Sequence, residues 1–527
     1  MFTHIPRPEP AFVIRSDGSV DPSTASIHRD GNLYTFTDDI FGYTIIVERD
    51  NITLDGGGYS LQGYGNSTGI FILNRHGVTV RNMKISGFYY GVRIFAAFSA
   101  PGTSNNNTLE DNLVTDNHYG VSITYSSLTR LRNNRMNNNT RNLWISDNVQ
   151  VHPQPPNLYI NDVDSSNTVD GKPIIYWVNK QDKTVPSDAG YVALINCTNI
   201  IVQNLDLAHN GQGIVLVFAT NSLITKNHII DTDSGIFAYK SSNIVITENN
   251  LESNDAGIDV RRFLNSSISL NTLTQNGNGA CLVDSQNGVF FGNKITRNLG
   301  YGIWLHGFNT STIEQNIITE NDEDGVIIFN SCNNTIVCNT IASNGYYGVK
   351  LWEDSSENMV SENLIANNII GVLIRGCVNN SIIRNMITEN KDLGLHLADG
   401  SNNNVIYHNN FVNNQEEIGI QVLITSTIDR TAVTETGGAN VWDNGTAGNY
   451  WSDYTTQYPT ATEIGDSGIG DTAFRINSIN IDRYPLMEPV DLGTIPEFPS
   501  WTILPLLLMA TLVVIIYKRN LPKSPTN

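Results

Sequence analysis

The chain has 527 residues, which is longer than a typical single globular domain. Its 51 acidic and 31 basic residues give a formal charge of −20, and this argues against nucleic acid as a partner, because phosphates bind basic surfaces. Only 16% of the residues are charged, and Asn, Ser and Thr carry much of the polarity. That composition is unlike a disordered acidic tail.

The N-terminal part has a repetitive but irregular pattern. Residues 1–10 contain no basic start followed by an apolar run, so no signal peptide is visible. Residues 11–65 alternate β-forming stretches with turns. Gly69-Ile-Phe-Ile, Gly91-Val-Arg-Ile and Gly120-Val-Ser-Ile then give early copies of a repeat. We expect an N-terminal cap and the first rungs of a repeat fold over residues 11–148.

Residues 149–190 interrupt this pattern. The run His152-Pro-Gln-Pro-Pro156 cannot join a strand ladder, because proline lacks the backbone N–H. Asp170-Gly-Lys-Pro173 predicts a turn, and Ile174-Ile-Tyr-Trp-Val178 predicts a strand. We interpret the segment as an insertion that projects from the repeat fold.

A regular array occupies residues 191–430. Its marker is a glycine followed by apolar residues at the first and third places, at intervals of 22 or 23 residues. These glycines are Gly213, Gly235, Gly257, Gly279, Gly302, Gly325, Gly348, Gly371 and Gly394. So constant a period indicates one structural unit per repeat.

Each repeat predicts three short strands separated by turns. In the copy from Gly325 to Tyr347, alternating apolar residues after the glycine predict one strand, and two further short β-forming runs follow. No segment is long enough for a repeating helix. The predicted fold is therefore all-β, a right-handed single-stranded parallel β-helix, whose handedness follows from that of parallel crossovers. The first and third places after each glycine point inward.

Asparagine recurs at two turns of the repeat. One set is Asn227, Asn249, Asn271, Asn293, Asn316, Asn339, Asn363 and Asn385. The other set is Asn254, Asn276, Asn298, Asn321, Asn344, Asn367 and Asn390. Stacked at one corner, such amides can hydrogen-bond from rung to rung, so we interpret both sets as structural ladders.

The C-terminal part changes composition. Residues 431–492 are rich in Gly, Asp, Tyr and Trp, and we expect them to cap the open end of the array. A linker over residues 493–500 leads to an apolar run at 501–517, which we interpret as a transmembrane anchor. The basic pair at the start of 518–527 predicts a cytoplasmic tail and a body outside the cell. A buried core helix is the alternative reading of the apolar run.

The second and fourth places after each glycine point outward and carry the candidate binding residues. Tyr239, Trp304, Phe329 and Trp352 could form a platform for sugar rings, and the substrate-binding candidates are Trp304, Phe329, Lys350, Trp352, Arg262 and Asp284. The alternative is that the aromatic rings only cover the sheet under the insertion or a neighbouring chain.

The catalytic candidates are Tyr239, Asp259, Arg261 and His306, on nearby rungs. Abstraction of a proton beside a uronate carboxylate needs a cation and a Tyr, Lys or His that moves the proton. Asp259 and Asp284 are the one pair suited to inverting hydrolysis, which needs two separated carboxylates. Ordinary salt bridges along the face explain the same charges.

The repeat Gly-[Ile/Val]-x-[Leu/Ile] with Asn-x-Ile-x-x-Asn resembles the NosD-type periplasmic copper-binding β-helix family, over about residues 11–490. That resemblance implies a pectin-lyase-like fold shared with carbohydrate-binding and sugar-hydrolysing domains. Epimerases and lyases of similar fold carry Asp-Pro-His, where this chain has Asp259-Val-Arg261. The tail Pro496-Glu-Phe-Pro499 with its apolar run resembles an archaeal sorting signal, which implies export.

Metal binding has weak support in the sequence. The ten histidines are scattered and no Met, His and Cys cluster is present, so we do not carry the copper label of the family over and predict no metal site. Calcium in the C-terminal module, through Asp453, Asp466 and Asp471, is the alternative.

These observations give three hypotheses. The first is a membrane-anchored cell-surface β-helix that binds polysaccharide or another envelope component. The second is a polysaccharide lyase, epimerase or glycoside hydrolase, and the third is an accessory protein in copper delivery. Ten Asn-x-Ser/Thr sequons suit a glycoprotein, although Asn and Thr also fill the repeat turns.

Overall fold

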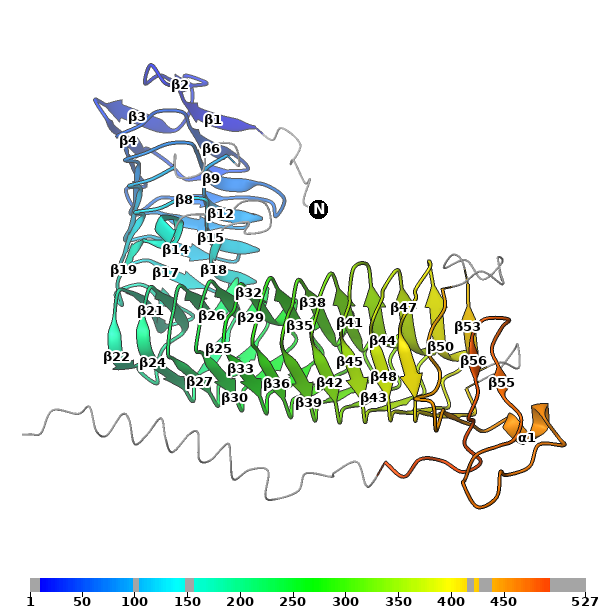
Figure 1. Cartoon of the computed structure of the whole chain (residues 1–527). Helices are drawn as coiled ribbons and strands as arrows, with labels where there is room; N and C mark the ends of the chain where they lie inside the picture. Colours follow the sequence, from blue (N-terminus) through cyan, green and yellow to red (C-terminus); the bar gives the residue numbers. More distant parts are fainter. Residues whose placement is uncertain (1–9, 98–103, 147–155, 415–420, 426–437, 493–527) are drawn as a thin grey trace, which may run out of the picture.

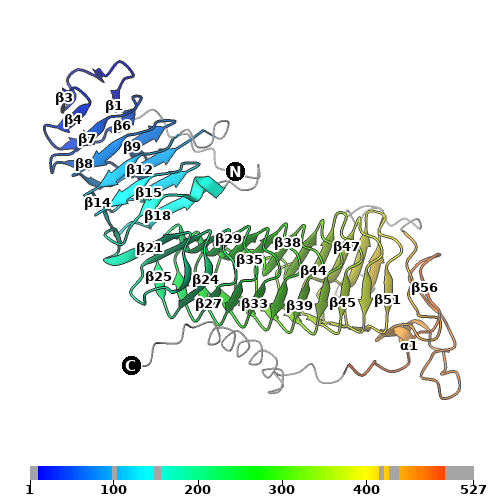
Figure 2. The same cartoon turned by 60° about the vertical axis from the view of Figure 1, so that its left-hand side comes forward.

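The computed structural model describes residues 10–97, 104–146, 156–414, 421–425 and 438–492. They form two parallel β-helices that meet at an angle, so that the chain has the outline of an L (Figures 1 and 2). We call residues 11–169 the first solenoid and residues 172–424 the second solenoid. Each consists of three parallel sheets with strands stacked rung on rung, which confirms the predicted all-β, right-handed parallel β-helix.

The first solenoid contains sheets A, B and C. Sheet A consists of β1 (Ala11–Ile14), β6 (Thr44–Val47), β9 (Thr68–Leu73), β12 (Tyr90–Phe95), β15 (Tyr119–Thr124) and β18 (Arg141–Ser146). Sheet B consists of β4 (Leu33–Phe36), β7 (Thr53–Asp55), β10 (Thr79–Arg81), β13 (Thr108–Glu110), β16 (Arg130–Arg132) and β19 (Asp162–Val163). Sheet C consists of β5 (Ile40–Phe41), β8 (Ser60–Gln62), β11 (Lys84–Ser86), β14 (Leu113–Thr115), β17 (Arg135–Asn137) and β20 (Thr168–Val169). Two antiparallel strands, β2 (Val20–Asp21) and β3 (Ile27–Asp30), pair with β1 and β4 at the N-terminal end.

The second solenoid contains sheets D, E and F. Sheet D consists of β21 (Lys172–Val178), β23 (Tyr191–Ile195), β26 (Gln212–Val217), β29 (Ser234–Tyr239), β32 (Ala256–Arg261), β35 (Asn278–Val283), β38 (Ile303–His306), β41 (Val326–Phe329), β44 (Tyr347–Trp352), β47 (Ile370–Arg375), β50 (Leu393–Ala398) and β53 (Val422–Ile424). Sheet E consists of β22 (Gln181–Thr184), β24 (Thr198–Gln203), β27 (Leu223–Thr225), β30 (Val245–Thr247), β33 (Ser267–Ser269), β36 (Val289–Phe291), β39 (Thr312–Glu314), β42 (Thr335–Val337), β45 (Met359–Ser361), β48 (Ser381–Ile383) and β51 (Val405–Tyr407). Sheet F consists of β25 (Asp206–Ala208), β28 (His228–Ile230), β31 (Asn250–Glu252), β34 (Thr272–Thr274), β37 (Lys294–Thr296), β40 (Ile317–Thr319), β43 (Thr340–Ala342), β46 (Leu364–Ala366), β49 (Met386–Thr388), β52 (Asn410–Val412) and β54 (Tyr450–Trp451).

The repeated glycine is required by the backbone of the next rung. A Cβ built on Gly235 would lie 2.6 Å from the carbonyl oxygen of Gly257, and one on Gly325 would lie 2.7 Å from that of Gly348. Such a contact is too close for any side chain, so glycine is required at this point for steric reasons. The apolar residues after it, such as Ile258 and Val260, are fully buried between the three sheets.

Asparagine ladders hold the rungs together at the turns. Asn227 Nδ2 donates a hydrogen bond to Asn249 Oδ1 at 2.9 Å, and Asn249 Nδ2 repeats the contact with Asn271. This confirms the first predicted set. In the second set the predicted Asn367 is wrong, because Asn368 accepts from Asn344 and continues the ladder.

A third asparagine ladder is present that the sequence did not lead us to predict. It runs through Asn334, Asn358, Asn380 and Asn404 at the turn between sheets D and E, with Nδ2 to Oδ1 distances of 3.0 to 3.1 Å. Nearer the first solenoid the same turn carries serines, and the Ser222 and Ser266 hydroxyls accept from backbone amides. Because this turn carries Ser in some rungs and Asn in others, the spacing of the asparagines alone did not reveal its repeat.

The described part of residues 149–190 joins the two solenoids and does not project. Its strands β19 and β20 pair with β16 and β17 in the first solenoid, and β21 and β22 pair with β23 and β24 in the second. A hairpin at Asp170-Gly171, both with positive φ, pairs β20 antiparallel to β21. The segment is therefore a junction between two β-helices, in place of the expected insertion.

The first solenoid ends against the flank of the second. Residues at its open end, including Ile145 and Val163, share one buried cluster with Val215, Val217 and Phe237, which point outward from sheet D. An open solenoid end exposes an apolar cross-section, so this contact removes it from water. Both sheets A and D border the inside of the resulting corner (Figure 1).

Residues 438–492 pack over the far end of the second solenoid. Trp451 of β54 stacks between Phe411 and Phe474, with ring centroids 4.6 and 4.2 Å apart, and so closes the core. A one-turn helix, α1 (Tyr454–Gln457), and a small hairpin of β55 (Phe474–Arg475) and β56 (Ile481–Asp482) complete this module. A 3₁₀ turn, η1 (Pro156–Tyr159), lies at the junction.

The predicted anchor at 501–517, its linker at 493–500 and the tail at 518–527 lie outside the described residues. Within the described ranges, no helix has the length and apolar character needed to cross a membrane.

Candidate functional site

The outward face of sheet D beyond the junction carries a line of neighbouring aromatic rings. Trp304 and His306 lie 6.2 Å apart between centroids, His306 and Phe329 lie 4.9 Å apart, and Phe329 and Trp352 lie 5.3 Å apart. All four side chains are half-buried, so their outer faces remain open to water. We call Trp304, His306, Phe329, Lys350 and Trp352 the aromatic strip.

Lys350 is fixed within this strip. Its Nζ lies 4.7 Å from the ring centroid of Trp352 and 3.4 Å from Asp324 Oδ2. Asp324 is buried, and burial raises its pKa while the Lys350 ammonium opposes that effect. The Trp352 indole N–H is buried and has no hydrogen-bond partner in the described chain. The strip therefore combines open ring faces with a held cation.

Tyr239, a candidate for proton transfer, is buried at the junction. Only 2% of it is exposed, and it packs in the same cluster as the end of the first solenoid. The sequence analysis left open that this ring only covers the sheet under residues 149–190, and Tyr239 does share its cluster with Tyr159 and Val163 of that segment. Since the first solenoid covers this rung, a polymer on the surface cannot reach the Tyr239 hydroxyl.

Asp259 and Arg261 form a bidentate ion pair on one strand. Arg261 Nε and Nη2 donate to the two carboxylate oxygens at 3.0 and 2.9 Å. The next residue along the Asp259 column is Cys281, whose buried thiol has its pKa raised to about 12 by burial. The two charges neutralise each other, so the salt-bridge alternative describes this pair.

His306 does not meet that pair. In register, Arg261 lies beside Val283, and Val283 lies beside His306, so two rungs separate them, about 10 Å at the usual strand spacing. The four catalytic candidates therefore share one face of sheet D without converging on one point.

Arg262 and Asp284 lie at the turn after sheet D, both with positive φ. They form an ion pair of 3.7 Å between Arg262 Nε and Asp284 Oδ2. Asp284 is thus directed to Arg262, and the proposed pairing of Asp259 with Asp284 for hydrolysis has no geometric basis here.

The first solenoid adds aromatic residues that the sequence analysis did not single out. On sheet A, Tyr90 and Tyr119 stack at 5.1 Å, and Trp144 lies 5.3 Å from Tyr119. Tyr89 and His118 contact the same rings from the preceding positions. A signal was present at Gly91 and Gly120, which directly follow Tyr89-Tyr90 and His118-Tyr119. Trp144 had no such signal, because Asn142 takes the place of the glycine in its rung.

Arg141 links the two walls of the corner through ion pairs with Asp233 and, at 3.8 Å, with Asp255. Arg141 Nε of β18 lies 2.6 Å from Asp233 Oδ1 in the second solenoid, and the Tyr119 hydroxyl donates to Asp233 Oδ2 at 3.1 Å. Burial raises the pKa of Asp233, and Arg141 opposes that rise. These contacts fix the solenoids against each other at the inside of the corner.

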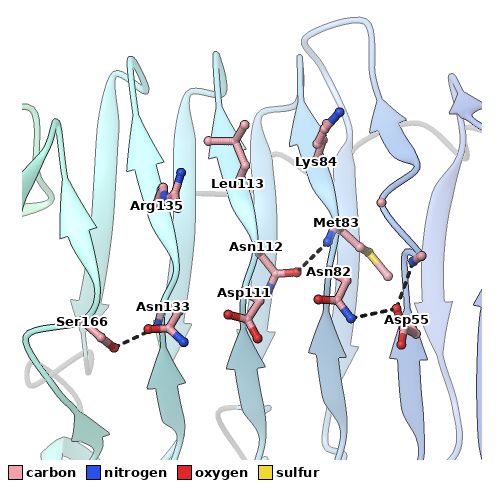
Figure 3. Close-up of a pocket in the computed structure, with 12 residues that line it drawn as sticks. Asp55, Asn82, Met83, Lys84, Asp111, Asn112, Leu113, Asn133, Arg135 and Ser166 are labelled. Carbon is pink, nitrogen blue, oxygen red and sulfur yellow. Dashed lines mark hydrogen bonds between the residues drawn. The ribbon is translucent and has the colours of Figure 1, made fainter.

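A second surface feature is a groove of about 930 Å³ along the turn between sheets B and C (Figure 3). Its polar groups serve the turns themselves. Asp55 Oδ1 accepts from Asn82 Nδ2 at 3.1 Å, and Asn112 Oδ1 accepts from the Met83 amide at 3.2 Å. The groove lining contains no aromatic ring, so the aromatic strip remains the stronger candidate.

The donor atoms for a metal are dispersed. Across the described ranges, no three His, Cys, Asp or Glu side chains come close enough to hold an ion together, and all five cysteines are free thiols. Copper prefers clustered His, Cys or Met ligands, so these residues do not fit a copper centre. For calcium, the Asp453 carboxylate already accepts hydrogen bonds from the Gln421 and Gln457 side chains, and the Asp471 carboxylate accepts one from the Thr462 amide.

Comparison with known proteins gives a family. The family described as Periplasmic copper-binding protein (NosD) matches residues 35–171, 192–372 and 347–456, more than half of the chain. No curated protein sequence matches at a significant level.

Several solved structures are similar in fold. The periplasmic alginate epimerase AlgG is 14% identical over 68% of this chain and 77% of its own, with a TM-score of 0.32. PfbA, a surface adhesin of Streptococcus pneumoniae, is 10% identical over 64% and 89%, with a TM-score of 0.37. The A-module of the Azotobacter vinelandii mannuronan C-5 epimerase AlgE4 is 14% identical over 65% and 86%, with a TM-score of 0.31. Likenesses of this size support no statement about activity.

Proposed function

The chain belongs to the family of periplasmic copper-binding proteins of the NosD type, and from that premise we propose that it is an extracytoplasmic protein that binds polysaccharide along the aromatic strip. The supporting observation is the line of partly exposed rings from Trp304 to Trp352 on the outward face of sheet D. Sugar rings present apolar C–H faces that pack on such rings, and a solenoid offers an extended surface for a polymer.

Binding accounts for the surface better than catalysis does. The strip has a cation at Lys350, and the carboxylate beside it, Asp324, is buried and paired with that cation. Asp259 is engaged by Arg261, and Tyr239 is buried. General acid–base chemistry needs groups within hydrogen-bond reach of the same substrate atom. Among the described residues, no cluster of His, Cys, Asp or Glu side chains supports a role in copper delivery, and we derive no step through copper.

Anchoring at the membrane completes the proposal. It rests on the apolar run at 501–517 and on the basic residues that follow it. When the full chain is expressed with a leader peptide, it should fractionate with membranes, and a chain ending at residue 500 should not. Equal distribution of the two chains would contradict anchoring and leave the glycan proposal intact.

The binding proposal is tested by removing the rings. Trp304→Ala combined with Trp352→Ala should weaken binding of the full chain to its polysaccharide by at least about tenfold, since each exposed stacking ring contributes roughly 1 kcal/mol. The measurement is affinity electrophoresis against a panel of neutral and acidic polysaccharides.

The control is Tyr64→Ala, because Tyr64 is an aromatic residue that is 80% exposed and lies in the first solenoid away from the strip. It should leave binding unchanged. Absence of binding to every polysaccharide, or equal losses in the control and the double variant, would refute the proposal. Release of an unsaturated or epimerised product would instead establish the enzymatic alternative.

A further inference from the structure

The outward face of sheet A holds a cation among aromatic rings. The Arg93 guanidinium carbon lies 4.5 Å from the ring centroid of Tyr90, 4.9 Å from Phe95 and 5.8 Å from Phe71. Phe71, Tyr90, Arg93, Phe95 and Ser122 belong to adjacent rungs, and we call them the Arg93 face. Arg93 is half-buried, so part of its side chain meets water.

Arg93 differs from three cations on the outward face of sheet D. Arg261 is paired with Asp259, Lys350 with Asp324 and Arg375 with Asp399. By contrast, no carboxylate of the described residues lies within ion-pair distance of Arg93. In a chain of net charge −20, acidic partners are abundant, so their absence at this rung sets the position apart.

Three polar atoms at this place are buried without a hydrogen-bond partner among the described residues. They are Arg93 Nε, Ser122 Oγ and Thr124 Oγ1. They are neighbours, because Arg93 lies beside Ser122 and Phe95 beside Thr124 in the parallel register of β12 and β15. Buried polar groups are normally satisfied, and each exception calls for an explanation.

The chemistry of these atoms selects the kind of ligand. A guanidinium can only donate hydrogen bonds. Because Ser122 is fully buried, the partly exposed Arg93 guanidinium is the group of this face that a surface polymer can reach. An oxyanion accepts only, and its bonds to a guanidinium are charge-assisted and strong. The surrounding rings of Phe71, Tyr90 and Phe95 suit the apolar face of a sugar that carries such a group. A free inorganic anion would gain nothing from those rings.

We propose that the Arg93 face binds an oxyanion carried on a polysaccharide, so that the ligand of this protein is an acidic glycan. This inference rests on the proposed function and specifies its ligand class. Sheets A and D form the two walls of one corner (Figure 2), and the Arg93 face belongs to sheet A and the aromatic strip to sheet D. A polymer held on the strip can therefore place an acidic residue at Arg93.

The test compares matched ligands and matched variants of the full chain. The ligands are polygalacturonate, its neutral methyl ester, dextran sulfate and neutral dextran. The variants are Arg93→Met and Arg135→Met. Arg135 is an exposed arginine of the same solenoid that points outward from sheet C, and it controls for the loss of one positive charge.

Wild-type protein should bind polygalacturonate at least about tenfold more tightly than the methyl ester, and Arg93→Met should abolish that preference. Arg135→Met should keep it, and Arg93→Lys should keep it in part, because lysine retains the charge without the fork geometry. Binding of the methyl ester should be the same in all variants. Preference for dextran sulfate over polygalacturonate would assign the oxyanion as a sulfate.

Other results would overturn the inference. If wild-type protein binds acidic and neutral polymers equally, or if Arg93→Met retains the preference, the Arg93 face is not the site, although the strip can still bind glycan. If none of the polymers binds, both this inference and the proposed function fail. Equal thermal midpoints of Arg93→Met and wild type, measured by circular dichroism, exclude misfolding as the cause of a loss.

Discussion

The two solenoids have the same interior and different exteriors. Both bury apolar columns and both stack asparagines at their turns, as Asn112 and Asn134 do in the first and Asn271 and Asn293 do in the second. Their outward faces determine what each rung contacts. Where sheet D presents Val215, Val217 and Phe237, the first solenoid packs against it. Where it presents Trp304, the surface stays open.

The difference between the two exteriors shows that, in a β-helix, the inward residues provide stability while the outward residues are free to provide recognition. Inward positions obey the period because every rung has the same neighbours above and below. Outward positions have no such constraint, so one face can serve as a docking surface at one end and as a binding surface further along. The following predictions test this separation, beginning with the largest effect.

Gly325→Ala should strongly destabilise the stacking of the rungs, which both solenoids share. The new Cβ would lie 2.7 Å from the Gly348 carbonyl oxygen, which belongs to the backbone and cannot move aside. We expect a loss of more than about 4 kcal/mol in stability, seen as a lowered thermal midpoint or insoluble protein. Gly376→Ala is the control, because its Cβ meets nothing within 4 Å and only its positive φ opposes the change. Equal effects of the two variants would contradict the steric reason.

Asp482 should make the C-terminal module more stable in mild acid. Its carboxylate is buried and accepts from the Asn449 amide and the Trp451 indole, and burial raises its pKa to about 6. The folded state therefore holds the proton more tightly than the unfolded state, whose pKa is about 3.8. This contribution is complete below about pH 4 and is lost as the pH rises through 6, by up to about 3 kcal/mol.

Thermal denaturation of wild type and Asp482→Asn between pH 4 and 7 measures this pH-dependent contribution of Asp482 to stability. The difference in thermal midpoint between the two proteins should vary with pH in this window, because the amide does not titrate. Asp471→Asn supplies the comparison, since hydrogen bonds from the Thr462 amide and hydroxyl lower the pKa of this exposed carboxyl. A constant difference between wild type and Asp482→Asn across the window would contradict the assignment.

Asp233→Ala should loosen the corner. It removes the carboxylate that holds Arg141 and the Tyr119 hydroxyl. The largely buried guanidinium keeps only its longer contact of 3.8 Å to Asp255 and its hydrogen bonds to backbone carbonyls, so we expect a cost of about 2 kcal/mol. Glu320→Ala is the matched control, because its pair with Arg297 has a similar distance but lies in water. Faster proteolysis between the solenoids in Asp233→Ala alone is the expected result. Equal rates in the two variants would show that the pair does not fix the corner.

The sequence alone determined the interior of the second solenoid. The glycine period, the inward apolar positions and most of two asparagine ladders followed from spacing, because each depends on residues one rung apart. The error at Asn367, where Asn368 takes the ladder position, arose because two adjacent asparagines satisfy the same spacing. The composition of the outward column likewise indicated a ring-lined face before the contacts were known.

Only the tertiary structure decided which outward residues are accessible. The junction brings Ile145 against Phe237, and Arg141 against Asp233, across about 90 residues of chain. Contacts of that separation leave no periodic mark in a sequence. Three features therefore followed only from the packing of the two solenoids, and no local sequence pattern specifies them. They are the burial of Tyr239, the role of residues 156–184 as a junction, and the place of Arg93 on the other wall of the corner from the aromatic strip.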